Sequence, residues 1–168
     1  MRCKDKYLIT VDPGKRESAG AIFKDGKLVG LEHVSTSSGG TILPEFRTGV
    51  ALSYALQDNL EEGATVHLII EEMVTRRGRR DAHRNLMQLS RMTGALAGHF
   101  QAGKITLNRA GLIAPALWTG GLSKNLHQAR TEGSLTGEER ELMRSRRLLS
   151  NSEALDAVGI GLYQLGRV

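Results

Sequence analysis

Four carboxylates stand at the ends of apolar segments, where a side chain can reach the edge of a folded core. They belong to Asp12, Glu71, Glu153 and Asp156. Closely spaced carboxylates repel one another, so they are buried together only when they are protonated or share a cation. Oxygen-only ligands suit Mg²⁺ or Mn²⁺ rather than zinc, and two such ions about 4 Å apart can activate a water and stabilise a leaving oxygen. The four residues therefore predict a divalent-metal site that hydrolyses phosphodiester bonds.

Most of these carboxylates also have a structural explanation when each is taken alone. Asp12 begins Asp-Pro-Gly, a common turn sequence. Glu71 is followed by Glu72, and side chains alternate along a strand, so only one of the two shares a face with Asp12; spacing leaves that choice open. Glu153 ends a Ser-Asn-Ser-Glu capping box, which would account for it without a metal. Asp156 lies in an apolar segment and is less well explained in this way.

The basic residues are clustered along a chain with a net charge of +5. One cluster begins shortly after Glu71 and consists of Arg76, Arg77, Arg79 and Arg80. A second cluster lies at residues 144–147. Clustered arginines gain affinity for phosphates by releasing condensed counterions, whereas scattered charges mostly provide solubility. We therefore predict a nucleic-acid partner, with a solvated loop and a polar helix face as the alternative.

Length and composition indicate one folded domain covering residues 1–168. The hydrophobic fraction of 40% and the charged fraction of 24% are ordinary for a globular protein. No apolar run approaches the roughly 20 residues that a membrane span requires. Cys3 is the only cysteine, which excludes an internal disulfide and fits a reducing compartment. We expect the protein in the cytoplasm.

The apolar patterns predict an α/β protein. We expect strands at 7–11, 19–23, 27–34 and 66–70, a shorter strand at 104–107, and helices at 45–60, 86–100, 136–149 and 151–165. Asp25-Gly26 is a hairpin signal, and residues 108–135 are expected to be irregular because they are rich in Gly and Ser. This order predicts a mixed sheet with helices on both faces.

Three motifs in order resemble those of the RuvC family of Holliday junction resolvases. They are Ile-Thr-Val-Asp-Pro-Gly at 9–14, Ile-Ile-Glu-Glu-Met at 69–73 and Glu-Ala-Leu-Asp-Ala at 153–157. The resemblance implies an RNase H-like fold with a five-stranded mixed sheet. It also places Glu71, rather than Glu72, at the position of the family's catalytic glutamate.

The resemblance further implies a homodimer in which each subunit nicks one of two opposed strands of a four-way DNA junction. Water would attack the phosphorus and leave 5′-phosphate and 3′-hydroxyl ends, as recombination and repair require. Two Mg²⁺ or Mn²⁺ ions would be bridged by Asp12, with Glu71, Asp156 and Glu153 completing the shells. Lys124 resembles the family's lysine that contacts the scissile region.

Two departures from the family pattern bear on specificity. Glu153 stands where the family usually has Asp or His, and arginines 76–80 replace an aromatic residue that stacks at the crossover. Met73 could act as a weak wedge, but arginines contact phosphates, which position DNA without reading its sequence. We therefore expect broad sequence tolerance and action on other branched DNA, as in phage-type members.

Three other functions compete with this interpretation. An RNase H-fold nuclease that processes ribosomal RNA would share the carboxylates, and a non-catalytic junction-binding module would share the fold. An ATPase of the actin and sugar-kinase kind also has Asp-x-Gly after its first strand. It needs two lobes and a much longer chain, so length excludes it.

Overall fold

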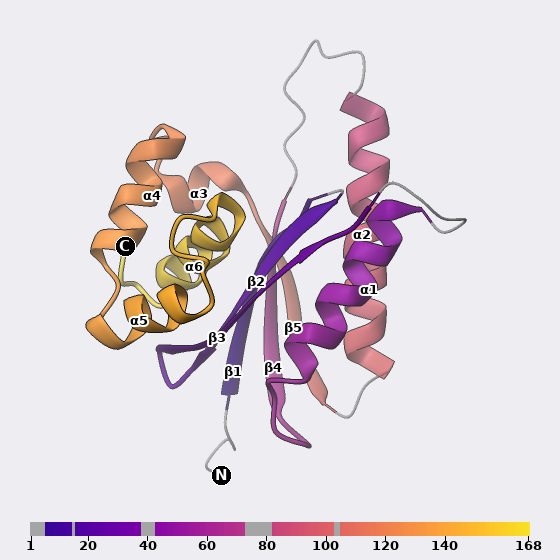
Figure 1. Ribbon diagram of the computed structural model, residues 1–168. Helices are drawn as coiled ribbons and strands as arrows, with labels where there is room; N and C mark the ends of the chain where they lie inside the picture. The colour runs from indigo at the N-terminus through magenta and orange to yellow at the C-terminus, as the bar shows by residue number, and fades with distance from the viewer. Residues whose placement is uncertain (1–5, 15, 38–42, 73–81, 103–104) are drawn as a thin grey trace.

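Five strands form one mixed sheet in this computed structural model, which describes residues 6–14, 16–37, 43–72, 82–102 and 105–168 (Figure 1). The strand order is β3-β2-β1-β4-β5. The strands are β1 Lys6–Asp12, β2 Glu17–Lys24, β3 Lys27–Ser35, β4 Thr65–Glu71 and β5 Thr106–Ile113. The first three strands are antiparallel, and β4 is parallel to both β1 and β5. The predicted five-stranded mixed sheet is confirmed.

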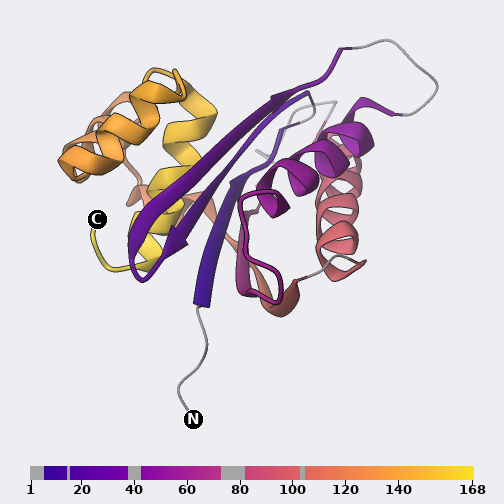
Figure 2. The same ribbon diagram turned by 60° about the horizontal axis from the view of Figure 1, so that its bottom comes forward.

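Helices cover both faces of this sheet, as Figures 1 and 2 show. One face carries α1 Pro44–Gln57 and α2 Ala82–Ala102, and the other carries α3 Pro115–Thr119, α4 Lys124–Gly133, α5 Gly137–Ser145 and α6 Ser152–Gln164. Successive side chains of β1 point to opposite faces of the sheet, so this strand contacts the helices on both sides. Ile9 packs in the core below α1 and α2, and Thr10 donates a 2.7 Å hydrogen bond to the carbonyl of Ala157 in α6. Within the described residues, no helix is long and apolar enough to span a bilayer.

The expectation that residues 108–135 are irregular is wrong. Strand β5 continues to Ile113, and α3 and α4 occupy much of the rest. Both β5 and α4 lack a strong apolar pattern, because β5 is an edge strand with many exposed side chains and α4 buries only His127 and Thr131. Burial against one neighbour is enough to hold such elements, but it leaves little periodicity in the sequence.

Two helix ends differ from the sequence prediction. Helix α5 stops at Ser145, and Arg147 then adopts a left-handed conformation with φ 58°. The capping box predicted to end at Glu153 is also wrong, because the N-cap of α6 is Asn151, whose side chain accepts a 2.8 Å hydrogen bond from the amide of Ala154. Glu153 therefore has no capping role.

Glu139 joins three separate parts of the chain. Its side chain accepts two 2.7 Å hydrogen bonds from Arg167 and one each from the amides of Leu28 and Thr136. The last of these completes the predicted capping box of α5. Burial by itself would raise the pKa of Glu139, but these hydrogen bonds outweigh burial and lower the pKa to about 2. The ionised carboxylate therefore stabilises the fold.

We expect Glu139→Gln to lower the free energy of unfolding by about 2 kcal/mol at neutral pH, because it leaves the half-buried Arg167 without its charge partner. A folded-state pKa below the unfolded one means that this contribution is present above about pH 4.3 and is lost as the pH falls towards 2. Urea unfolding at pH 7 and pH 3 measures both effects. Glu61→Gln, which breaks the exposed pair with Lys24, is the control; equal midpoints for the two variants at pH 7 would contradict the prediction.

Candidate active site

Asp12 ends β1 on the sheet face that α6 covers. It is paired across the strands with Ala19, which packs in the core beneath α6, and it is two residues beyond Thr10, which bonds to α6 directly. Burial raises the pKa of Asp12 well above its usual value, and the nearby charges of Glu71 and Asp156 raise it further. Asp12 is therefore half-buried among other carboxylates.

Glu71 ends β4, directly beside the end of β1. The parallel register pairs Val11 with Ile70, and Ile70 packs below α1 and α2, so Glu71 points to the opposite face together with Asp12. Glu72 follows the strand and is exposed. The alternation of side chains along β4 thus places Glu71, and not Glu72, on the face of Asp12. Spacing alone leaves this choice open, and the family resemblance also favours Glu71.

A buried tryptophan holds Glu71 in place. Trp118 is 2% exposed, and its Nε1 donates a 2.9 Å hydrogen bond to Oε1 of Glu71. Burial raises the pKa of Glu71, and this hydrogen bond only partly opposes that rise. Gly159 in α6 leaves room for the indole, because a Cβ there would lie 2.8 Å from the Trp118 ring. The small residue on α6 therefore serves the tryptophan that supports the site.

Asp156 lies in α6 and receives contacts from α4. Lys124 Nζ is 3.2 Å from its Oδ2, and Gln128 Nε2 donates a 2.8 Å hydrogen bond to its Oδ1. His127 Nδ1 is 3.7 Å from the same Oδ1, and its ring meets Trp118 edge-on with centroids 4.8 Å apart. Helices α3 and α4 therefore hold the carboxylates of Glu71 in β4 and Asp156 in α6 in position.

The charge distribution favours a cation at this point. Burial raises the pKa of both Asp12 and Glu71, and the charge of Asp156 raises both further, so the two carboxylates are costly to ionise side by side. Lys124 supplies one positive charge: burial alone would lower its pKa, but Asp156, Asp12 and Glu153 together raise it. The donors are carboxylate oxygens, which suit Mg²⁺ or Mn²⁺. These residues therefore fit a hard divalent ion.

Glu153 lies one turn before Asp156 in α6 and faces a different group of side chains. Its carboxylate, that of Glu17 at the start of β2 and a ring nitrogen of His33 in β3 all lie within 4.8 Å of one another. Glu153 also adds to the field at Lys124. It therefore stands at the margin of the carboxylate centre, between Asp156 and the paired strands β2 and β3.

The structure brings most of the predicted site residues together. Asp12, Glu71, Asp156 and Lys124 converge, whereas Arg76, Arg77, Arg79, Arg80 and Met73 lie outside the described residues. The sequence prediction missed Trp118, His127 and Gln128. Gln128 follows Lys124 by four residues, so both would lie on one helix face. This spacing has meaning only on a helix, and the sequence predicted no helix within residues 108–135.

Comparison with solved structures identifies the fold. The structure of T. thermophilus RuvC in complex with a Holliday junction substrate matches with a TM-score of 0.54 at 16% identity, covering 96% of this chain and 97% of that one. The chain has the RuvC fold. A second T. thermophilus RuvC structure matches with a TM-score of 0.57 at 15% identity, covering 96% of this chain and 97% of that one.

A third similar structure comes from yeast. The yeast mitochondrial Holliday junction resolvase Ydc2 matches with a TM-score of 0.51 at 15% identity, covering 95% of this chain and 79% of that one. No protein-family model matches the sequence, and no curated protein matches it either. The likeness to these proteins is therefore one of fold alone.

Proposed function

We propose that this protein is a metal-dependent endonuclease that resolves four-way DNA junctions by paired symmetric nicks. The observation that supports this proposal is the convergence of Asp12, Glu71 and Asp156 from three separated segments. Burial there, together with the charge of Asp156, raises the pKa values of Asp12 and Glu71. A folded protein keeps such like charges together at a cost, and pKa values perturbed in this way are concentrated at functional sites. The clustered arginines of the sequence supply affinity for phosphate.

The three carboxylates would hold the ions, with Asp12 between Glu71 and Asp156. Bound Mg²⁺ or Mn²⁺ supplies a nucleophilic water and stabilises the leaving oxygen of the phosphodiester. The 2.9 Å bond from Trp118 fixes one oxygen of Glu71, and the bond from Gln128 does the same for Asp156. Outer residues of this kind orient ligands and tune the affinity for the ion. Glu153 would complete the shell from the next turn of α6.

Lys124 would contact the DNA at the scissile phosphate. Its ammonium is 3.2 Å from Asp156, yet the side chain is 55% exposed, so it can reach an incoming phosphate without leaving the carboxylates. A phosphate bound there would lie beside the nucleophile, and cleavage would leave 5′-phosphate and 3′-hydroxyl ends. Arg76, Arg77, Arg79 and Arg80 would add contacts to the backbone that do not depend on its sequence.

Paired nicks require two active sites, so we propose a homodimer. Helix α2 supports this idea, because Gly94 and Gly98 are exposed and a Cβ at either would meet no other atom within 4 Å. Leu86 and Met87 on the same helix are also exposed. Such a face lets a second helix approach closely.

The decisive experiment incubates the wild-type chain and Mg²⁺ with a labelled four-way DNA junction, the matching linear duplex and a structured RNA. We expect symmetric nicks in the junction that a ligase can seal, and little cutting of the duplex. Junctions with scrambled cores should be cut at comparable rates. A difference above about a hundredfold between cores would contradict the expected sequence tolerance.

The same experiment separates the rival functions. Faster cutting of the structured RNA than of the junction would favour ribosomal RNA processing and overturn the resolvase proposal. Tight binding of the junction without any cutting, in Mg²⁺ and in Mn²⁺, would favour a non-catalytic binding module. No observation favours either of these alternatives over the resolvase.

A further inference from the structure

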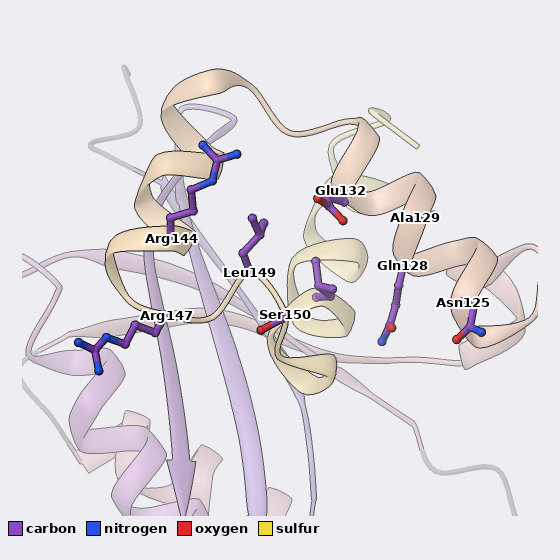
Figure 3. A pocket seen from close by; sticks show the side chains of 9 residues that line it. Asn125, Gln128, Ala129, Glu132, Arg144, Arg147, Leu149 and Ser150 are labelled. Atoms are coloured by element: carbon purple, nitrogen blue, oxygen red, sulfur yellow. The ribbon is translucent and has the colours of Figure 1, made fainter.

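A solvent-open pocket lies next to the carboxylate centre, between α4 and the connection from α5 to α6. Its volume is about 670 Å³. Ala129, Leu149 and Leu155 contribute apolar surface, and Arg144 and Glu132 stand on opposite walls, as Figure 3 shows. The inside of this pocket is thus apolar with one charge of each sign, and it differs in this from the pocket's edge.

One edge of the pocket is polar and begins at the candidate active site. In Figure 3, Gln128, Ser150 and Arg147 follow one another along the lower edge. Gln128 is the residue that donates to Asp156 at 2.8 Å, so the two features share a side chain. We call this row of three residues the polar edge.

Arg147 holds an unusual backbone conformation at the end of the polar edge. Its φ of 58° is left-handed, and its amide bonds to the carbonyl of Arg144 at 2.8 Å where α5 terminates. Glycine is the usual residue at such a helix end, and any other side chain there costs about 1 kcal/mol. An arginine at this position therefore carries a cost that its backbone role does not require.

We propose that the polar edge binds the sugar-phosphate backbone of a DNA strand that extends from the cut site. The inference rests on the proposed function, and it gives a role to Arg147 of the second basic cluster, in which Arg146 pairs with Glu32 and Arg144 with Glu141. Arg147 places positive charge at one end of the row, and the other end reaches Asp156 with its partner Lys124 in the proposed metal site. Glu132 on the inner wall repels phosphate, so the backbone stays at the edge and does not enter the pocket.

The test measures junction binding in the cleavage-deficient Asp12→Asn background, with a labelled four-way DNA junction and Mg²⁺ at several salt concentrations. Arg147→Gly removes the cation and relieves the left-handed backbone, so this variant should unfold at the same temperature or higher. Ser150→Glu adds a negative charge in the middle of the row on an exposed side chain. Lys27→Gln is the control, because it removes one exposed cation at the other end of β1–β3.

We expect Arg147→Gly to weaken junction binding about tenfold and to reduce the salt slope by about 0.9, the amount for one lost phosphate contact. Ser150→Glu should weaken binding at least as much, and Lys27→Gln should stay within about twofold of its parent. Affinities and salt slopes for both edge variants equal to those of Lys27→Gln would overturn the polar-edge proposal. Failure of the wild-type chain to cut the junction would instead overturn the proposed function.

Discussion

Asp12→Asn is expected to reduce junction cleavage at least roughly a thousandfold while making the metal-free protein more stable. The loss follows because Asp12, as a proposed metal ligand, would contribute several kcal/mol to stabilising the transition state. The gain follows because Asn removes a half-buried carboxylate whose ionisation is opposed by burial and by the charges of Glu71 and Asp156. A gain of about 1 kcal/mol would raise the unfolding temperature by roughly 2 to 4 °C in a chain of this size. Cleavage assays and thermal unfolding in EDTA measure the two effects.

The dependence on pH distinguishes this explanation from simple damage to the site. Asp12 has a higher pKa in the folded than in the unfolded chain, so its contribution to stability is present below about pH 3.9 and is lost as the pH rises through the folded value. The stability advantage of Asp12→Asn should therefore grow from acidic to neutral pH, and Mg²⁺ should stabilise only the wild type strongly. A variant that is less stable than the wild type at pH 7 in EDTA would contradict the prediction.

Glu71→Gln and Glu72→Gln form a matched pair of adjacent, isosteric substitutions with opposite expected outcomes. Glu71 points to the face of β4 that Asp12 shares and accepts a hydrogen bond from Trp118. Glu72 is exposed beyond the end of the strand. We expect Glu71→Gln to lower the cleavage rate more than about a hundredfold, because an amide is a weaker metal ligand, and Glu72→Gln to change it less than about threefold.

Two further measurements make the comparison specific. Binding of the junction should be similar for both variants, since neither side chain needs to contact phosphate. A higher Mg²⁺ concentration should partly restore Glu71→Gln if the lost function is ion binding, and it should leave Glu72→Gln unchanged. Equal cleavage by the two variants would show that the register of β4 does not select the catalytic glutamate.

Local signals in the sequence were sufficient for most of the elements. The alternating strands around Asp25-Gly26 predicted the hairpin, where Asp25 has φ 51° and Gly26 has φ 79° as the turn requires. Capping of α5 by Thr136 and Glu139 was equally local. Helix α4 was missed because it buries only His127 and Thr131. Such weakly amphipathic elements are held by contacts with distant residues, which periodicity does not reveal.

The site, like the fold, depends partly on local sequence and partly on contacts between distant segments. The residue types, their order and their places at the ends of apolar segments indicated a carboxylate centre, because a carboxylate beside a core needs a cation or a proton. Only the packed structure decided which side chains share it. The register of β1 against β4 brings Glu71 and not Glu72 beside Asp12, and α4 brings Lys124 and Gln128 to Asp156. Those choices depend on distances between segments far apart in the chain, which no local pattern contains.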